Sequence, residues 1–482
     1  MKSASNSDAH RARSDARLDV AERRRRAIVR CVFILFVMLV FEGSMRKWIA
    51  PQMAQYLYFM RDPVALVLYV MALRNGAFRP LHPLLAAGLT FAVIAIPIAV
   101  IQCVSGGSPN QTMFEIYGWR NYFWYLPLPF VIASQFRERD LNALGKLAVV
   151  LLTIAAGLSL VQFQSAPDSI WNAGAAEDEA LQFKSLRSAN GHIRPTGTFT
   201  STLGLVEMTV STAALVLSSW ILPRKERPMN SAWLLTGALS VALSLSVSGS
   251  RTMFLAVGIV VLGGIMSGFV MRRTERMMRA ITIPIVLVLV FVMLFPLVFA
   301  EGYATITSRW DEASQSEARG VFGRVTAELL DSLRLVGDVP ILGYGIGLGG
   351  NAAQTLQVSG GATSSIPYTE TDWARHMVDL GPLVGLCFII YRLVFTWRLG
   401  AAALAATRVS QRPLPLLAFS YVGIVLLEAQ VTGNGIVNGF CWLYVGICMA
   451  ASRQKSPVAP EVGSPEDTAL VVVTRRPGNL MR

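Results

Sequence analysis

The sequence has few charged residues, and it lacks the clustered cysteines or histidines that build metal and disulfide sites. Only 15% of its 482 residues are charged, 53% are hydrophobic, and the mean hydropathy is +0.48. This composition is far from that of soluble proteins and argues against a soluble enzyme. The cysteines show no CxxC spacing and the histidines stand singly, so neither a disulfide framework nor a zinc cluster is expected. These residues are Cys31, Cys103, Cys387, Cys441 and Cys448, and His10, His82, His192 and His376.

Long apolar runs are abundant instead. Runs of about 17 to 25 residues, the length that crosses a bilayer, recur along most of the chain. They predict an all-α polytopic membrane protein with about twelve transmembrane helices. Besides the run that follows Arg30, we expect spans at 55–73, 82–103, 118–135, 143–163, 201–221, 231–249, 252–270, 280–300, 377–397, 413–430 and 435–451.

Positive charge is concentrated between alternate apolar runs. The net charge is +13, but no soluble nucleic-acid-binding module accompanies it, so we interpret the charge as a topology signal. An even number of helices puts segments such as 224–227 and 398–412, and both chain termini, in the cytoplasm.

This topology divides the chain into five parts. A basic, disordered cytoplasmic tail precedes helices 1–9, and a long periplasmic loop separates these from helices 10–12, which a second disordered cytoplasmic tail follows. The five parts are residues 1–27, 28–300, 301–375, 376–451 and 452–482.

Several arginines depart from the rule that positive charge collects on the cytoplasmic side, because they fall on the outer side. Arginine keeps its charge and offers a planar fork of donors that suits phosphate oxygens. The alternative is that these side chains extend to lipid headgroups. Arg251 ends a short serine-rich hairpin that begins at Ser248, and Arg194 opens a turn before the helix that starts near Ser201. Both should face a polar environment.

The long outer loop carries two further features. Residues 321–336, which include Arg324, have an apolar stripe at helical spacing and predict a helix in the membrane interface, either catalytic or a simple lid. The glycine-rich stretch 343–350 could form a nest of backbone N–H groups for phosphate, although a turn packed closely on a helix is the stronger interpretation.

The segment that leads into the next helix holds candidate proton acceptors. Glu370, Asp372 and His376 lie there with Arg375. Such side chains can act as general bases. The alternative is helix capping by Thr369 or Thr371, with acidic residues in the first turn.

Together these features resemble the bacterial O-antigen ligase and polysaccharide (Wzy-type) polymerase superfamily. The resemblance covers about His192 to Gly385. It rests on Arg194-Pro-Thr-Gly-Thr-Phe199, the hairpin ending in Arg251, the long late loop, and Gly323-Arg324 followed by Pro340-Ile-Leu-Gly-Tyr-Gly345. One departure is clear. The family usually has a His-Asn pair at the opening of the helix with the paired glycines, and counting back from Gly381 puts Glu370 there.

The resemblance implies a glycosyltransferase with a GT-C-like architecture in the bacterial inner membrane. Such an enzyme moves an oligosaccharide from undecaprenyl diphosphate to an acceptor hydroxyl at the periplasmic face, without metal or cofactor and with inversion. Its partners would be the lipid-linked donor, membrane lipid, and a glycan, lipid A core or protein acceptor, with no nucleic acid. Arg194, Arg251, Arg324 and Arg375 would bind the diphosphate, and Glu370, Asp372 or His376 would be the base.

Other functions stay open at this stage. A transporter or flippase of an anionic lipid-linked or sugar substrate would also need arginines, although it should place them near the middle of helices. A scaffolding subunit is a further alternative. Within the enzyme class the residues do not separate polymerase from ligase, and loss of the His-Asn pair favours an O-antigen or exopolysaccharide polymerase in exopolysaccharide or lipopolysaccharide biosynthesis.

Cysteine labelling tests the topology. Cysteines introduced at Ser316 and Ser359 are expected to react with a membrane-impermeant thiol reagent from the periplasmic side, because both lie in the long outer loop. A cysteine at Ser456 should react only after the inner membrane is permeabilised. The reverse pattern would show that the two sides are assigned the wrong way round.

Overall fold

The computed structural model confirms an all-α chain rich in apolar helices. It describes residues 2–106, 111–173, 193–272, 274–316, 332–350, 369 and 371–454. The elements that form the main bundle are α1 (Lys2–Ser44), α3 (Asp62–Arg74), α4 (Pro83–Gly106), α5 (Gln111–Trp119), α6 (Leu128–Gln135), α7 (Glu138–Gln164), α9 (Thr202–Ile221), α10 (Ser231–Ser248), α11 (Arg251–Val270), α12 (Thr274–Val298), α16 (Asp372–Ser410), α17 (Leu414–Glu428) and α18 (Gly435–Ser452).

Short elements and α13 complete the described chain. A π-helical turn, η1 (Met45–Ile49), extends α1, and a second one, η3 (Arg120–Trp124), joins α5 to the segment before α6. The shorter turns are η2 (Pro51–Met53), α2 (Ala54–Leu57), η4 (Ile170–Asn172) and η5 (Leu335–Gly337), and α13 (Ala300–Ser316) follows α12.

Nine of the described helices are long and apolar enough to cross a membrane. They coincide with the first expected span and with eight of the others. The remaining three expected spans correspond to α3, to the interrupted segment α5–η3–α6, and to α17, which are shorter. The helix predicted over 321–336 lies mostly outside the described residues.

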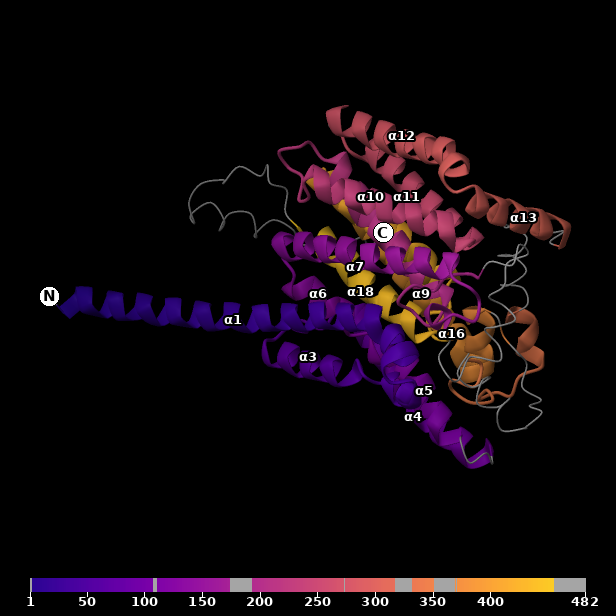
Figure 1. Cartoon of the computed structure of the whole chain (residues 1–482). Helices are drawn as coiled ribbons and strands as arrows, with labels where there is room; N and C mark the ends of the chain where they lie inside the picture. Colours follow the sequence, from indigo (N-terminus) through magenta and orange to yellow (C-terminus); the bar gives the residue numbers. More distant parts are fainter. Residues whose placement is uncertain are drawn as a thin grey trace, which may run out of the picture.

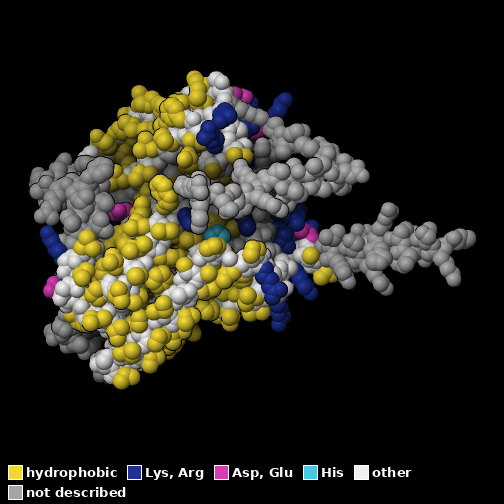
Figure 2. Space-filling view, turned by 180° about the vertical axis from the view of Figure 1, so that it is seen from behind, with side chains coloured by type: hydrophobic (Ala, Val, Ile, Leu, Met, Phe, Trp, Pro, Cys, Tyr) yellow, Lys and Arg dark blue, Asp and Glu magenta, His cyan; other side chains and the backbone are white. Residues whose placement is uncertain are grey.

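The centre of the bundle is formed by α9 and α18, whose side chains are almost all buried. At the periphery, α12 exposes most of its apolar side chains. Figure 2 shows one face of the molecule that is largely hydrophobic, with few charged side chains. An exposed apolar surface of this extent is what contact with lipid requires.

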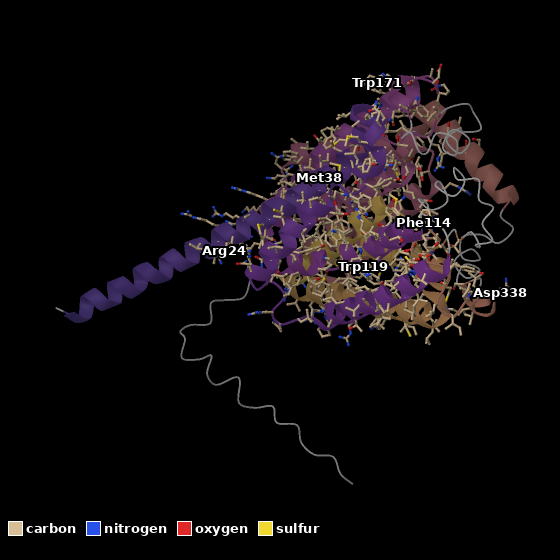
Figure 3. The ribbon with its side chains drawn as sticks, turned by 90° about the horizontal axis from the view of Figure 1, so that it is seen from below. Arg24, Met38, Phe114, Trp119, Trp171 and Asp338 are labelled. Carbon is tan, nitrogen blue, oxygen red and sulfur yellow. The ribbon has the colours of Figure 1, made fainter. Side chains whose placement is uncertain are left out.

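The N-terminal segment differs from the expected disordered tail over residues 1–27. The structure describes one helix from Lys2 to Ser44, which projects from the bundle (Figure 1). Figure 3 places Arg24 near the point where this helix enters the bundle and Met38 inside it. The stretch from Lys2 to Glu42 contains neither proline nor glycine, so the helix of the first span can continue backwards without a break.

The bundle has two chemically different ends. One end of the bundle lies away from the starts of α9, α11, α16 and α18, and we call it the opposite end. There Arg25 pairs with Asp140 at 2.5 Å and Arg276 pairs with Glu226 at 2.6 Å. Arg412 there pairs with Glu138. This end therefore collects basic segments that the sequence assigns to a single side of the membrane. The other end, called the site end, is where α9, α11, α16 and α18 begin.

A kink divides α16 near the site end. Gly381 has φ = +78°, and a Cβ there would lie 2.0 Å from the carbonyl oxygen of Ile341. Only glycine fits this conformation and this close contact. Pro382 follows directly, so a short helix from Asp372 to Leu380 precedes the long remainder of α16.

Candidate functional site

The short first part of α16 presents one polar face to the interior. Asp372, Arg375, His376 and Asp379 are spaced three or four residues apart, so they share a side of the helix. All four are buried, with exposed fractions of 2% or less. Thr371 caps this helix, since its hydroxyl accepts a hydrogen bond from the backbone N–H of Ala374.

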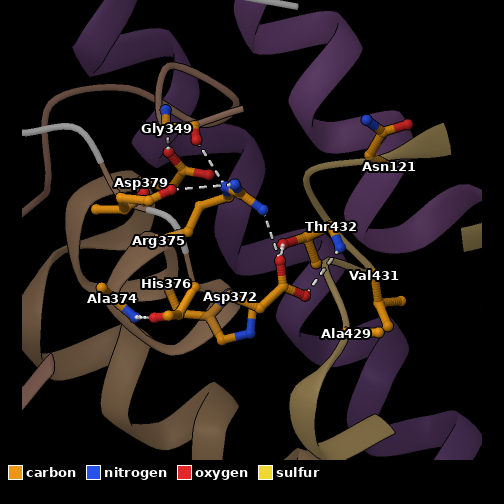
Figure 4. Close-up of polar contacts among 12 residues, drawn as sticks. Asn121, Gly349, Asp372, Ala374, Arg375, His376, Asp379, Ala429, Val431 and Thr432 are labelled. Carbon is orange, nitrogen blue, oxygen red and sulfur yellow. Dashed lines mark hydrogen bonds and ion pairs between the residues drawn. The ribbon is translucent and has the colours of Figure 1, made fainter. Parts of the chain in front are cut away.

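Asp372 lies at the centre of the polar contacts (Figure 4). Its Oδ1 accepts from Arg375 Nη1 at 2.7 Å and from the Thr432 hydroxyl at 3.1 Å. Its Oδ2 accepts from Arg392 Nη1 at 2.8 Å and from the Thr432 backbone N–H at 3.0 Å. A carboxylate offers about four acceptor positions. Those of Asp372 are therefore taken by the protein itself.

His376 has a partner on each ring nitrogen. Arg392 Nη1 lies 3.0 Å from Nε2, and the Tyr122 hydroxyl lies 2.9 Å from Nδ1. Arginine can only donate, so Nε2 accepts and Nδ1 carries the proton in a neutral ring. Tyr122 in turn donates to Asp379 Oδ2 at 3.1 Å. The tautomer of His376 is thus set by its neighbours.

These contacts close into a ring through the glycine-rich stretch. Asp379 Oδ1 accepts from the Gly349 N–H at 2.9 Å, and Arg375 Nε donates to the Gly349 carbonyl at 2.6 Å. The ring runs through Tyr122, His376, Arg392, Asp372, Arg375, Gly349 and Asp379, and we call it the buried ring. It contains two carboxyl groups and two guanidinium groups. A buried network with its members satisfied is rigid and fixes one arrangement of the helices that contribute to it.

The connection between α17 and α18 is packed against the buried ring. Thr432 supplies two donors to Asp372, and a Cβ at the next residue, Gly433, would lie 1.8 Å from Arg375 Nη1. Only a residue without a side chain allows this approach. Arg392 also donates to the carbonyl oxygens of Leu426 and Ala429, so the end of α17 is fixed by the same guanidinium.

The glycine-rich stretch 343–350 is packed on helices, as the stronger interpretation of the sequence expects. The N–H of Ile346 donates to Glu115 Oε2 at 2.8 Å and to Gln102 Oε1 at 3.2 Å. The N–H of Gly349 is taken by Asp379. Carboxyl groups of the protein thus occupy two of the N–H groups that a phosphate would need.

A second polar cluster lies at the site end near α1. Arg61 pairs with Glu42 at 2.7 Å and donates to the Gly435 carbonyl at 3.0 Å. Arg120 pairs with Asp62 at 2.5 Å, and the Tyr125 hydroxyl donates to the same carboxylate. Two arginines that fall on the outer side in the sequence are therefore bound to carboxylates inside the protein, rather than to lipid headgroups.

The predicted site residues are only partly brought together. Asp372, Arg375 and His376 lie in the buried ring. Arg251 is the first residue of α11 and is half-buried, following Ser250, which caps that helix. Arg194, also half-buried, begins the turn before α9. Arg324 and Glu370 lie outside the described residues.

Sequence reasoning did not select Tyr122, Arg392, Asp379 or Thr432. Arg392 could have been found, because a charged residue inside the apolar run 377–397 needs a partner in the protein. Asp379 lies in the same run and carries the same signal, whereas Tyr122 and Thr432 carry none. In the described part of the chain, no group of three or more histidine, cysteine or acidic residues could hold a metal ion.

Comparison with known protein families agrees with the resemblance drawn from the sequence. Residues 236–389 match a family model described as O-antigen ligase. This stretch includes Arg251 and the first part of α16 with Asp372, Arg375 and His376. No curated protein matches the chain. This match supports the resemblance to the O-antigen ligase and polymerase superfamily.

Loss of one member of the buried ring should destabilise the protein. Arg392→Gln removes a partner from Asp372 and leaves a buried carboxylate incompletely paired, which costs about 3–5 kcal/mol. We expect a clearly lower unfolding temperature for the purified protein in detergent. Adding Asp372→Asn should recover part of this loss, because the orphaned charge is then absent.

Arg398→Gln is the matched control, since Arg398 is exposed on the same helix. It should unfold like the wild type. Equal unfolding temperatures for Arg392→Gln and Arg398→Gln would mean that the buried ring does not stabilise the fold.

Proposed function

We propose that this protein, whose residues 236–389 match a family model described as O-antigen ligase, is an inner-membrane glycan transferase. It moves an oligosaccharide from undecaprenyl diphosphate to an acceptor hydroxyl at the periplasmic face. The reaction is that of a polysaccharide polymerase or an O-antigen ligase. The site end of the bundle is the periplasmic end in this proposal, because the basic segments collect at the opposite end.

The observation that carries the proposal is the anchoring of the entrance to α16. Arg375 Nη2 donates to the Thr369 carbonyl at 3.3 Å, and Thr371 caps the helix. Both chain neighbours of Glu370 are therefore tied to buried or helical groups. A base must be held within about 3 Å of the proton that it takes, and an anchored helix entrance suits that requirement.

Glu370 is our choice for the base. Asp372 uses its acceptor positions on Arg375, Arg392 and Thr432, and His376 has both ring nitrogens engaged. Either would have to leave the buried ring to take a proton from a substrate. We assign Asp372, His376 and Arg375 to positioning, since Arg375 is 1% exposed and donates to Asp372 and to the carbonyls of Gly349 and Thr369.

The reaction then proceeds as a single displacement. The acceptor hydroxyl oxygen attacks the anomeric carbon of the donor sugar, and its proton passes to the Glu370 carboxylate. The bond between that carbon and the diphosphate oxygen breaks, and undecaprenyl diphosphate leaves with the electron pair. Arg194, Arg251 and Arg324 offset the growing negative charge on the leaving group, which is where fixed cations lower the barrier most. Attack from the face opposite the diphosphate inverts the anomeric carbon.

Substitution of Glu370 tests the chemistry. With purified protein, a lipid-diphosphate-linked oligosaccharide and an acceptor in the same detergent micelles, Glu370→Gln should lower turnover by roughly 10²–10⁴ while donor binding is kept. Asp372→Asn should lower turnover together with thermal stability, and His376→Gln should be milder. Glu428→Gln, which alters an exposed carboxylate at the site end, is the control.

This assay also separates the proposal from transport. A transferase forms a new glycosidic bond in micelles, where no membrane divides two compartments, whereas a flippase forms no product there. Absence of product with every acceptor class would contradict the proposed function. If only His376→Gln abolished turnover, histidine rather than Glu370 would be the base.

Substitution of Arg251 tests the leaving-group contact. Arg251→Ala should abolish glycan assembly in cells without changing protein level or membrane insertion, because the diphosphate loses a charged partner at the half-buried start of α11. Arg251→Lys should rescue poorly, since an ammonium lacks the bidentate fork. Assembly at the wild-type rate in Arg251→Ala would remove Arg251 from the site. Arg279→Ala, at the opposite end, serves as the control.

A further inference from the structure

The outer end of α1 brings a lysine into contact with the turn before α9. Lys47 lies in the π-helical turn η1 and is only 5% exposed. Its Nζ donates to the Thr196 hydroxyl and to the Gly197 carbonyl, both at 2.9 Å, and it lies 4.4 Å from the centre of the Trp48 ring. π-Helical turns often mark functional sites in longer helices.

The charge of Lys47 is not balanced inside the described part of the protein. Its two hydrogen-bond acceptors are neutral, and no carboxylate pairs with it there. An ammonium group has three protons to donate, so one donor remains beyond these two contacts. Arg61 and Arg120, the buried cations of the second polar cluster, are both paired with carboxylates. A buried charge without a counter-charge is costly, and an anionic ligand would remove that cost.

Thr198 gives a second, independent indication. It is 1% exposed, and its carbonyl accepts from the Ser44 hydroxyl at 3.1 Å, but within the described chain its own hydroxyl has no hydrogen-bond partner. A buried hydroxyl of this kind normally has a partner. The backbone N–H groups of Thr196 and Gly197 are already taken by Gln162 Oε1. A ligand would therefore be bound by side-chain donors.

The turn also carries Arg194, two residues before the threonine that Lys47 contacts. The ammonium of Lys47, which contacts this turn, and the hydroxyl of Thr198 and guanidinium of Arg194, which the turn carries, are donors of the kind that bind phosphate oxygens. We propose that Lys47, Thr198 and Arg194 form a phosphate subsite that binds the diphosphate of the lipid-linked donor. This inference rests on the proposed function and adds α1 to the donor site.

A lipid-linked diphosphate fits better than the headgroup of a bulk phospholipid. Lys47 and Thr198 are buried between helices, and Glu42, on the last turns of α1, connects through Arg61 to the carbonyl of Gly435. The same α17–α18 connection contacts Asp372 through Thr432. The last turns of α1, which precede Lys47, are therefore connected to the segment that contacts the entrance of α16, where transfer would occur.

Binding measurements on the full-length protein in nanodiscs of neutral lipid test the proposal. Native mass spectrometry would give the dissociation constant for undecaprenyl diphosphate in wild type, Lys47→Met, Lys47→Arg and Thr198→Val. We expect Lys47→Met to weaken binding at least about tenfold, the effect of losing a hydrogen bond from a charged group. Thr198→Val should weaken it about threefold, and Lys47→Arg should keep most of the affinity. Lys225→Met, exposed near the opposite end, should bind like wild type.

Competing ligands identify the anion. Undecaprenyl monophosphate, inorganic pyrophosphate and phosphatidylglycerol would be added in turn to the wild-type complex. Displacement by pyrophosphate, with little displacement by phosphatidylglycerol, supports the diphosphate assignment. Displacement by phosphatidylglycerol at equal concentration would overturn it in favour of a general headgroup site.

The two proposals fail in different ways. Wild-type affinity in both Lys47→Met and Thr198→Val would overturn the subsite, and the transfer assay would still report on the function. Thr198→Val keeps the test decisive if Lys47→Met does not fold. Glu370→Gln should retain wild-type binding of undecaprenyl diphosphate while it loses turnover. A wild-type protein that does not bind this lipid would overturn the subsite and the proposed function together.

Discussion

The contact between Asp372 and the two guanidinium groups of Arg375 and Arg392 holds the site end of the bundle together. The two arginines reach the same carboxylate from the first turn of α16 and from its long part beyond the kink at Gly381. Thr432 adds the α17–α18 connection to the same carboxylate. One buried anion therefore orients three segments that come from different parts of the last third of the chain.

The reason for such a network is that the bundle is surrounded by lipid instead of water. A membrane interior offers no water to satisfy a polar side chain, so each polar group at membrane depth must find its partner in the protein. The buried ring and the pairs Arg61–Glu42 and Arg120–Asp62 follow this rule. Lys47 also has hydrogen-bond partners in the protein, but among the described residues they are neutral and no carboxylate pairs with it, and this contrast with Arg61 and Arg120 makes Lys47 a candidate for a ligand. Buried arginines that are paired with carboxylates stabilise the fold, whereas a buried cation whose partners are all neutral favours the binding of an anion.

The proposed division between positioning and chemistry follows from the same contacts. Groups whose hydrogen-bonding capacity is used inside the protein fix the shape of the site, as Asp372 and His376 do. Arg251, the half-buried first residue of α11, is not a member of the buried ring, so in the proposed site its contact with a substrate would leave the ring intact. A site arranged in this way keeps its costly buried charges away from the reacting atoms.

The sequence by itself determined the fold class, the positions of the long helices and the turns that carry Arg194 and Arg251. These depend on local properties, namely the length of apolar runs, the placement of basic residues and the small residues of a tight hairpin. The sequence also identified the entrance of α16 as a polar segment. It did not show which side chains there are engaged by partners inside the protein, and this is the use of each side chain. That use was decided by tertiary structure, because Tyr122 meets His376 across 254 residues of chain and Thr432 meets Asp372 across 60. Whether a carboxylate or an imidazole can take a proton depends on which partners already occupy it, and those partners come from helices that no local pattern brings together.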